Sequence, residues 1–290
     1  MRLAYIISAY KYPQQLIRLI RRLHNSQASI FIHIDRKTDE REYEDVVQAI
    51  GHMPDVYFLK RYHCYWGEFG HVQATREGIK QLIERAIPFD YAILLTGQDY
   101  PIKTNRQIVD FLRQSSGTSF MDYFSLPHEE WQYGGLNRIE RWHIRFFQRR
   151  YIFPMDRSTW IKRRFPRGFQ PFGGSSYWCL ANECIEYIYR RVKDRPDLLR
   201  FFRSVDVPDE IFFQTILMNS PLREHIANDD LHYIDWKDLN GGSPGILCKA
   251  DFEAIMQSPK LFARKFDMTV DPDVLDMIDR VIEEEGVRSG

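Results

Sequence analysis

The chain has 290 residues, of which 44% are hydrophobic and 14% aromatic, and its 40 basic residues balance 40 acidic ones. This composition indicates a folded globular protein with a substantial core, and the balanced charge argues against a polyelectrolyte as its main partner. The four cysteines show no CxxC spacing, and no apolar run reaches the roughly 18 to 20 residues that span a bilayer, so we expect neither a disulfide scaffold nor a transmembrane protein.

Four short apolar runs in the first hundred residues predict β-strands, and two amphipathic segments among them predict helices. The strand-like runs cover residues 3–10, 29–35, 56–60 and 91–97, and the helical segments cover 12–25 and 71–86. Strands that alternate with helices indicate an α/β fold with a mostly parallel sheet. We found no repeat or linker, so we expect a single domain over residues 1–290.

Polar residues follow three of the predicted strands, where ligands of parallel sheets usually bind. Asp35 and Lys37 come after the second strand, Asp99 follows the fourth, and the first ends in SAYKYP. Asp, Gly and Pro also form turns through their own chemistry, so a purely structural role remains an alternative for Asp35 and Asp99. His33 lies on an apolar strand and is predicted to be a hydrogen-bonded core residue.

Two features in the second half of the chain place charge beside apolar residues. Arg264 and Lys265 stand between Phe262 and Phe266, a setting that favours binding of an anion such as phosphate; a solvated charge pair is the alternative. In residues 205–221, two carboxylates directly precede a run that is apolar almost all round.

Five ordered motifs resemble those of the core-2/I-branching β-1,6-N-acetylglucosaminyltransferases and the peptide O-xylosyltransferases. They read LLTGQDYPIKT, PFGGSSYWCL, VPDEIFFQTILMNSP, LHYIDW followed by GGSP, and LFARKFD, and the likeness extends from Leu3 to Asp267. It implies the α/β sandwich of the nucleotide-diphospho-sugar transferases (GT-A type). It also implies inverting transfer of xylose or N-acetylglucosamine from a UDP donor to a hydroxyl of a glycan, lipid-linked glycan or glycoconjugate.

The resemblance also assigns roles to residues of this chain. It implies Glu210 as the catalytic base, Arg264 and Lys265 as ligands of the donor diphosphate, and Asp35 and Lys37 as contacts of the nucleoside. Three further residues are placed in the donor or acceptor cleft: Trp66, Asp99 and Ser176. For Trp66 a core position is the alternative, and Ser176 stands where the xylosyltransferases carry an Asp.

The chemistry of inverting transfer explains why one carboxylate suffices. An acceptor hydroxyl displaces UDP in a single step, and a positioned base that takes its proton contributes about 10²- to 10⁴-fold in rate. We expect Glu210 at or near the first turn of the buried helix, where the helix dipole favours its ionised form, and Asp209 as the helix cap. The alternative is that Glu210 also serves only the helix start.

No metal site is predicted. Asp99 stands alone where many transferases of this fold carry Asp-x-Asp, and Asp271 and Asp273 are explained by capping of the helix that follows them. Fixed cations can replace a metal ion as stabilisers of the leaving diphosphate. We therefore expect a UDP-sugar as co-substrate and no cofactor, with a catalytically inactive nucleotide-sugar or carbohydrate-binding protein as the alternative.

A basic, aromatic-rich segment lies between Arg141 and Arg167. It contains nine Lys or Arg residues and one acid, Asp156. It is either a solvated loop, a lid that binds the acceptor, or a surface that contacts an anionic membrane. Nucleic acid is not expected, because no recognised binding motif accompanies the charge. Met1 leads directly into the first strand, so we expect no signal peptide and a cytoplasmic location, peripheral at the membrane.

Overall fold

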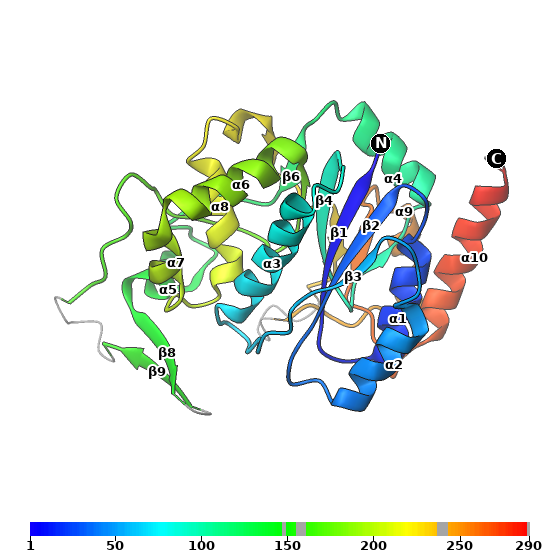
Figure 1. Ribbon diagram of the computed structural model, residues 1–290, viewed down its shortest axis with the longest axis horizontal. Coiled ribbons are helices and arrows are strands. Elements are labelled where there is room, and N and C mark those ends of the chain that lie inside the picture. Colours follow the sequence, from blue (N-terminus) through cyan, green and yellow to red (C-terminus); the bar gives the residue numbers. More distant parts are fainter. Residues whose placement is uncertain (147–148, 155–160, 237–242, 289–290) are drawn as a thin grey trace.

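The computed structural model describes residues 1–146, 149–154, 161–236 and 243–288. Its centre is a seven-stranded sheet (Figure 1). Across the sheet the strands are β12 (Ile226–Ala227), β6 (Ser119–Met121), β11 (Trp178–Ala181), β4 (Tyr91–Thr96), β1 (Leu3–Ala9), β2 (Ala28–Ile34) and β3 (Val56–Phe58). Strand β11 is antiparallel to β4 and β6, whereas the other neighbours in this sheet pair in parallel.

Helices cover both faces of this sheet. One hydrophobic cluster joins it to α1 (Pro13–Leu23), α2 (Glu40–Ile50), α4 (Asn105–Gln114), α9 (Phe252–Gln257) and α10 (Asp273–Arg288). A second cluster joins it to α3 (Gly70–Glu84), α5 (Leu136–Glu140), α6 (Asn182–Asp194), α7 (Pro196–Phe202) and α8 (Phe212–Met218). The predicted α/β class, a mostly parallel sheet flanked by helices, is confirmed.

Smaller elements surround this core. A three-stranded sheet contains β13 (His232–Ile234), β14 (Phe262–Arg264) and β5 (Tyr100–Pro101), and two ribbons pair β7 (Phe124–Ser125) with β10 (Phe172–Gly173) and β8 (Trp142–Phe146) with β9 (Arg149–Phe153). Short 3₁₀ turns are η1 (Gln132–Gly135), η2 (Pro208–Glu210), η3 (Arg223–His225) and η4 (Lys249–Asp251). The β8–β9 ribbon projects from one end of the molecule (Figure 1).

The four predicted strands are β1 to β4, and the two predicted helices are α1 and α3. Side chains of β1 alternate between the two clusters, with Tyr5 and Ile7 on one face and Ala4 and Ile6 on the other, because successive side chains of a strand point to opposite faces. Both clusters thus share the strands of one sheet. The extent of the domain, residues 1–290, stays a prediction.

The register brings the polar strand ends together. Ser8 of β1 lies opposite His33 of β2 and Thr96 of β4, so the loops after these three strands leave the same edge of the sheet. His33 is 1% exposed, with Nδ1 3.1 Å from Ser8 Oγ, and Nε2 accepts from the Tyr62 backbone N–H at 3.0 Å. Burial lowers the pKa of His33 to about 4. Its predicted role as a satisfied core residue is confirmed.

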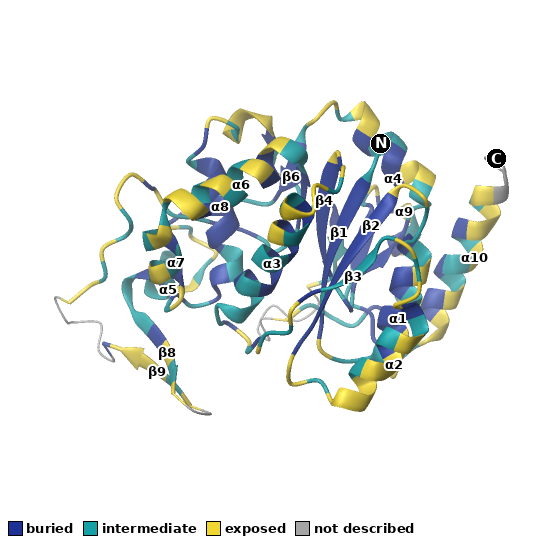
Figure 2. Ribbon diagram, in the orientation of Figure 1, coloured by how far each residue is buried: buried dark blue, intermediate teal, exposed yellow. Residues whose placement is uncertain are grey.

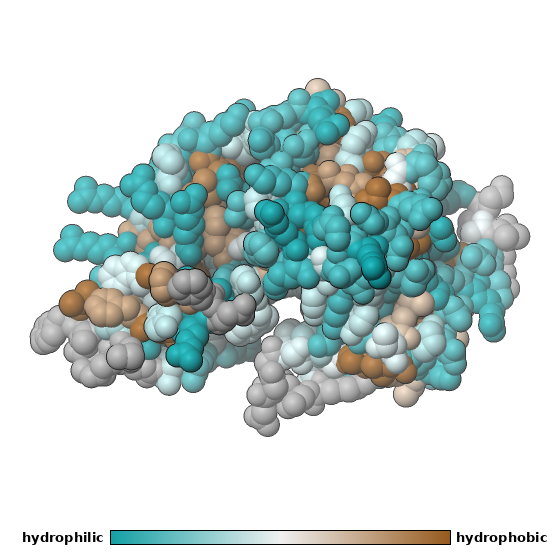
Figure 3. Space-filling model, turned by 60° about the horizontal axis from the view of Figure 1, so that its bottom comes forward, coloured by the Kyte–Doolittle hydropathy of each residue, from teal (hydrophilic) through white to brown (hydrophobic). Residues whose placement is uncertain are grey.

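Buried residues gather in the strands of the sheet and on the helix sides that face it (Figure 2), and most of the face drawn in Figure 3 is hydrophilic. Hydrophobic side chains reach the surface at the left end of Figure 3, the end at which Figure 1 shows β8 and β9. Within the described part of the chain, no helix has both the length and the apolar character needed to cross a bilayer.

We predict that Phe213→Ala destabilises the fold strongly. Phe213 is 1% exposed, and its ring lies 5.8 Å from that of Trp178 and 5.1 Å from that of Phe212. Truncating a packed Phe costs about 3 to 5 kcal/mol, which urea unfolding would measure. The control Val270→Ala, at a site that is 57% exposed, should change the free energy of unfolding by about 0.5 kcal/mol or less. Equal losses in both variants would contradict the assignment of α8 to the core.

Candidate functional site

A buried ion pair stands at the end of β4. Nη1 of Arg264, the last residue of β14, lies 3.1 Å from Oδ1 of Asp99, and the two side chains are 11% and 0% exposed. The other Asp99 oxygen accepts from the backbone N–H of Thr96 at 2.5 Å. The guanidinium also lies 4.2 Å from the ring centre of Tyr177. Asp99 therefore acts as the counter-ion that fixes Arg264, and it is enclosed by protein.

A second cation, Lys265, follows Arg264 in the chain, and the charge of a third, Lys11, acts on Lys265. Lys265 donates from Nζ to Ser243 Oγ at 2.7 Å. Its pKa is lowered, first by burial and then by the positive charges of Arg264 and Lys11. Lys11 follows β1 and donates to the hydroxyl of Tyr12 at 2.9 Å. The smaller part of this shift, which comes from Arg264 and Lys11, indicates positive charge around Lys265 that a bound anion would offset.

A carboxylate site lies at η2. Nη1 of Arg138 donates to Oε2 of Glu210 at 2.6 Å, and the Glu210 side chain keeps 32% of its surface exposed. Burial and the neighbouring Asp209 raise the pKa of Glu210 to about 7, whereas Arg138 acts in the opposite direction. At neutral pH this carboxyl is therefore close to its titration midpoint.

The loop from Gly174 to Tyr177 connects η2, which contains Asp209 and Glu210, to Arg264. The Gly174 N–H donates to the Glu210 carbonyl at 3.0 Å, Ser176 Oγ donates to Asp209 Oδ2 at 2.8 Å, and Tyr177 lies under Arg264. The structure thus brings Glu210, Ser176, Asp99 and Arg264 into one chain of contacts.

The buried helix α8 supports this loop from behind. All seven of its residues are buried, and Gln214, which is 0% exposed, donates from Nε2 to the Ser175 carbonyl at 2.5 Å. A Cβ on Gly174 would lie 2.0 Å from the Asp122 carbonyl oxygen, so only glycine permits this close approach. The apolar run after the two carboxylates therefore anchors the loop that joins the two ends of the site.

The expectations about η2 and α8 hold in part. Glu210 lies near the first turn of α8: it ends a 3₁₀ turn two positions before the helix begins at Phe212, and Ile211 between them breaks the helical geometry with φ −133°. Asp209 does not cap that helix; its carboxylate accepts from Ser176 instead. The helix dipole is also not decisive, since burial raises the pKa of Glu210.

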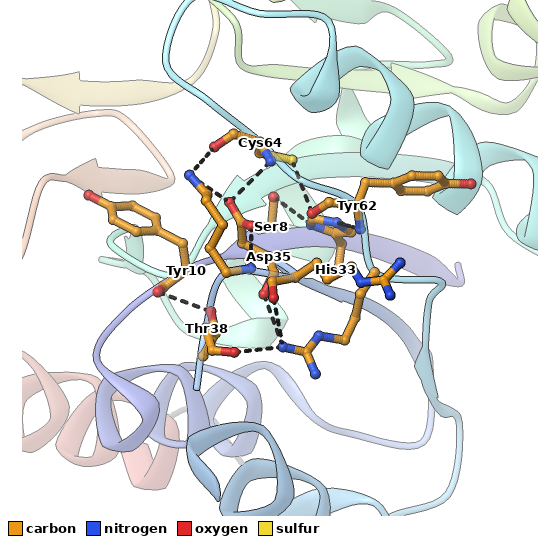
Figure 4. Close-up of polar contacts among 10 residues, drawn as sticks. Ser8, Tyr10, His33, Asp35, Thr38, Tyr62 and Cys64 are labelled. Atoms are coloured by element: carbon orange, nitrogen blue, oxygen red, sulfur yellow. Dashed lines mark hydrogen bonds and ion pairs between the residues drawn. The ribbon is translucent and has the colours of Figure 1, made fainter. Parts of the chain in front are cut away.

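Asp35 lies beneath the loop that follows β3 (Figure 4). It is 1% exposed, and its carboxylate accepts from the backbone N–H groups of Lys37 at 2.9 Å and Cys64 at 3.2 Å. Nζ of Lys37 lies 3.4 Å from Asp35 Oδ2, donates to the Cys64 carbonyl at 2.8 Å and lies 4.3 Å from the ring centre of Tyr65. Asp35 thus orders this loop, and its contact with a nucleoside stays a prediction.

Trp66 is 74% exposed, so the alternative of a core tryptophan is wrong. It lies beside η2, because the carbonyl of the next residue, Gly67, accepts from the Val207 N–H at 3.0 Å. Gly67 has φ +71°, and a Cβ there would lie 3.1 Å from Asp206 Oδ1, so the turn requires glycine. The exposed indole therefore lies near η2, the turn that contains Glu210, and is available to contact a sugar or a base.

The predicted capping role agrees with the contacts of Asp271 but not with those of Asp273. Asp271 accepts from the backbone N–H groups of Lys249 and Asp273, where α10 begins, whereas the Asp273 carboxylate accepts from Lys249 Nζ at 2.8 Å. In the described residues, no group of three or more His, Cys, Asp or Glu is arranged to hold a metal ion.

The sequence analysis missed two charged residues of the site. Arg138 lies on the five-residue helix α5, and nothing in its local sequence distinguishes it from other surface arginines. Lys11 follows the first strand within SAYKYP, a polar strand end that could have drawn attention to it.

The chain is similar to known proteins over most of its length. Residues 3–257 match the family model described as Core-2/I-Branching enzyme. Xylosyltransferase 2 of Rattus norvegicus is 27% identical over 300 residues, and the alignment covers 96% of this chain and 33% of the relative. Xylosyltransferase 1 of Homo sapiens is 25% identical over 300 residues, and the alignment covers 96% of this chain and 30% of the relative. The chain thus spans about a third of the length of these relatives. A solved 4-diphosphocytidyl-2C-methyl-D-erythritol synthase from Anaerococcus prevotii aligns over 68% of this chain and 75% of its own, at 11% identity and a TM-score of 0.34.

We predict that Arg138→Gln raises the pKa of Glu210 above its value of about 7. The amide removes the positive charge that stabilises the ionised carboxyl, so the group stays protonated to higher pH. Carboxyl carbon NMR across a pH series would measure the titration midpoint. The control Arg223→Gln removes an arginine paired with the exposed Glu224 and should leave that midpoint unchanged. An unchanged or lower midpoint in Arg138→Gln would contradict the assignment.

Proposed function

Because this chain belongs to the core-2/I-branching enzyme family, we propose that it is an inverting glycosyltransferase. It moves xylose or N-acetylglucosamine from a UDP donor to a hydroxyl of a glycan or glycoconjugate acceptor. The observation that carries the proposal is Glu210, a partly exposed carboxyl with a pKa of about 7, which the loop from Gly174 to Tyr177 connects to Arg264.

Glu210 is the general base in this proposal. The acceptor oxygen forms a bond to the anomeric carbon while the bond from that carbon to the UDP oxygen breaks, and the hydroxyl proton passes to Glu210. A base works best when its pKa lies near the working pH, because it is then both ionised and basic. The value of about 7 meets that condition. Above that pH the carboxyl is mainly ionised and able to accept the proton.

Arg138 has two effects on this base. Its hydrogen bond of 2.6 Å fixes the orientation of the carboxylate, and its charge opposes the increase in pKa that burial causes. The arginine itself lies 3.7 Å from the ring centre of Trp131, so packing holds it in place. We infer that Arg138 is a positioning residue for Glu210.

Arg264 and Lys265 bind the donor diphosphate in this proposal. Burial holds Arg264 in place, and its Nε is enclosed without a hydrogen-bond partner among the described residues, so an oxyanion that reaches the guanidinium would satisfy a costly unpaired donor. Lys265 adds a second charge, and Lys11 adds to the local positive potential. Cations fixed before the reaction stabilise the charge that develops on the leaving phosphate without reorganisation.

Asp99 supports a mechanism without a metal ion. Its carboxylate is fully buried, with one oxygen bonded to the Thr96 N–H and the other beside Arg264. A carboxylate that is already neutralised by a guanidinium is poorly suited to ligate a divalent ion. We therefore propose that Arg264 and Lys265 replace the metal, that the UDP-sugar is the co-substrate, and that no cofactor is needed.

The remaining proposed roles belong to residues near the edge of the sheet at which β1, β2 and β4 end. Lys37, ordered by Asp35, is proposed to contact the nucleoside, and Trp66 lies between that loop and η2. Ser176, through its hydrogen bond to Asp209, is proposed to line the sugar-binding region. In this proposal the donor contacts lie at the ends of β2, β4 and β14, and the base lies at the opposite end of the chain of contacts.

We predict that Glu210→Gln binds the donor but loses transfer by about 10²- to 10⁴-fold, because the amide keeps the shape of the side chain and cannot take a proton. Release of UDP from UDP-xylose and UDP-N-acetylglucosamine, with and without glycan acceptors, would measure turnover. A shift of the melting temperature by each UDP-sugar would measure binding, since a ligand stabilises the fold that binds it.

The control Glu224→Gln changes an exposed glutamate away from the site and should keep full activity. Near-wild-type turnover by Glu210→Gln would refute the base. A wild-type chain that binds UDP-sugars but never releases UDP would favour the alternative, a catalytically inactive nucleotide-sugar or carbohydrate-binding protein.

We predict that activity persists in EDTA, because side-chain cations take the place of a metal ion at the diphosphate. The same UDP-release assay with and without the chelator would measure this. Lys265→Ala should weaken UDP binding in both conditions, whereas Lys80→Ala, on the exposed side of α3, should not. Complete loss of activity in EDTA that Mn²⁺ restores would overturn the metal-independent mechanism.

A further inference from the structure

The β8–β9 ribbon has two different faces. Its cross-strand pairs place His143, Arg145 and Arg150 on one face, together with Ile152. The other face contains the pairs Trp142 with Phe153, Ile144 with Tyr151 and Phe146 with Arg149, because residues opposite each other in an antiparallel ribbon share a face. The two faces therefore differ in chemistry, one basic and the other mostly apolar.

The basic face holds the ribbon against the body of the protein. Arg145 pairs with Glu68 and Arg150 pairs with Asp206. His143 is buried, with Nε2 3.1 Å from the Asn137 carbonyl oxygen, and its backbone N–H donates to the Ser204 carbonyl at 2.9 Å. The side chains of Arg145, Arg150 and His143 make these contacts from one face, so the second face points away from the body except at Trp142, which lies against Arg163.

The second face exposes aromatic and aliphatic side chains to solvent. Ile144 is 51% exposed, Phe146 65%, Tyr151 52% and Phe153 55%. Strand β9 is exposed along most of its length (Figure 2), and hydrophobic side chains gather at this end of the molecule (Figure 3). Exposed apolar residues that cluster in this way mark a binding surface more often than isolated ones do.

Basic residues accompany this apolar face. Arg149 lies on it, and no acidic residue occurs in the sequence from 141 to 155. Arg163 lies 5.7 Å from the ring centre of Trp142 and so brings residues 161–164 beside the ribbon. There Ile161 is 56% exposed and Arg164 is also exposed. The surface thus combines aromatic and aliphatic side chains with cations.

We propose that this surface binds an anionic lipid bilayer. Tryptophan, tyrosine and phenylalanine bury apolar area at the level of the lipid head groups, and arginines are attracted to anionic lipids. A second copy of this chain fits less well, because this face of the ribbon contains Arg149 and no carboxylate that could pair with it across a symmetric contact. Direct binding of the acceptor to this face is also less favoured. The face points away from Asp206, which is four positions before Glu210 in the chain, and therefore away from the proposed base.

The position of the ribbon has a consequence that rests on the proposed function. Asp206 and Gly67 lie under the ribbon and next to η2, so a membrane bound at the outer face would lie close to the side of the molecule that carries Glu210. An acceptor anchored in that membrane, such as a lipid-linked glycan, would then be held at this end of the molecule, although the outer face itself points away from the base.

Vesicle co-sedimentation would test the proposal without donor or acceptor. The full chain is expected to pellet with phosphatidylcholine vesicles that contain phosphatidylglycerol, and to pellet much less with phosphatidylcholine alone or at high salt. Arg149→Gln should weaken binding roughly fivefold, as expected for one basic residue near an anionic surface. The double change I144E and Y151E, on one cross-strand pair, should weaken it by more than about tenfold.

The matched control is Val270→Glu, which adds a charge at an equally exposed apolar residue away from the ribbon and should keep binding. Circular dichroism and UDP-sugar melting shifts would show that the variants remain folded, so failure here is separable from failure of the transferase proposal. Equal binding to neutral and anionic vesicles, or no binding to either, would overturn the inference. Self-association lost in I144E and Y151E without vesicle binding would assign the face to a second copy instead.

Discussion

The ion pair between Asp99 and Arg264 is the constraint on which the site depends. Both side chains are almost fully removed from water, and a buried charge is costly unless it is paired. Separating Arg264 from Asp99 would therefore be costly, so the pair fixes the end of β14 against the end of β4. The same pairing decides the chemistry available there, because it leaves a rigid cation, and not a free carboxylate, to meet an anionic ligand.

Glu210 shows how opposing effects can set a functional pKa. Enclosure by protein and the adjacent Asp209 favour the protonated form, whereas Arg138 favours the ionised form, and the result lies near neutral pH. The buried helix α8 supports this part of the structure, because its Gln214 donates to the loop that runs from η2 to Tyr177 and Arg264. The charges beside the apolar run are therefore part of one arrangement of carboxyl, loop and cation.

The ribbon β8–β9 departs from the usual division into an apolar core and a polar surface. Its basic face packs against the body of the protein through ion pairs to Glu68 and Asp206, so its apolar face remains exposed to solvent. Such an arrangement costs solvation free energy in the isolated chain and is most readily explained by a partner that covers it. Because the same ion pairs border η2, this surface and the site share structural support.

The sequence alone determined the α/β class, the strands β1 to β4 and the helices α1 and α3, because hydrophobic periodicity is a property of neighbouring residues. It also determined the family and drew attention to Glu210, Asp99 and Arg264 as candidates. Only the tertiary structure decided that Asp99 pairs with Arg264, that Arg138 bonds Glu210, and that Asp209 bonds Ser176 and caps no helix. These contacts join residues far apart in the chain, and a pKa depends on every group packed around a carboxyl, so local patterns could not predict them.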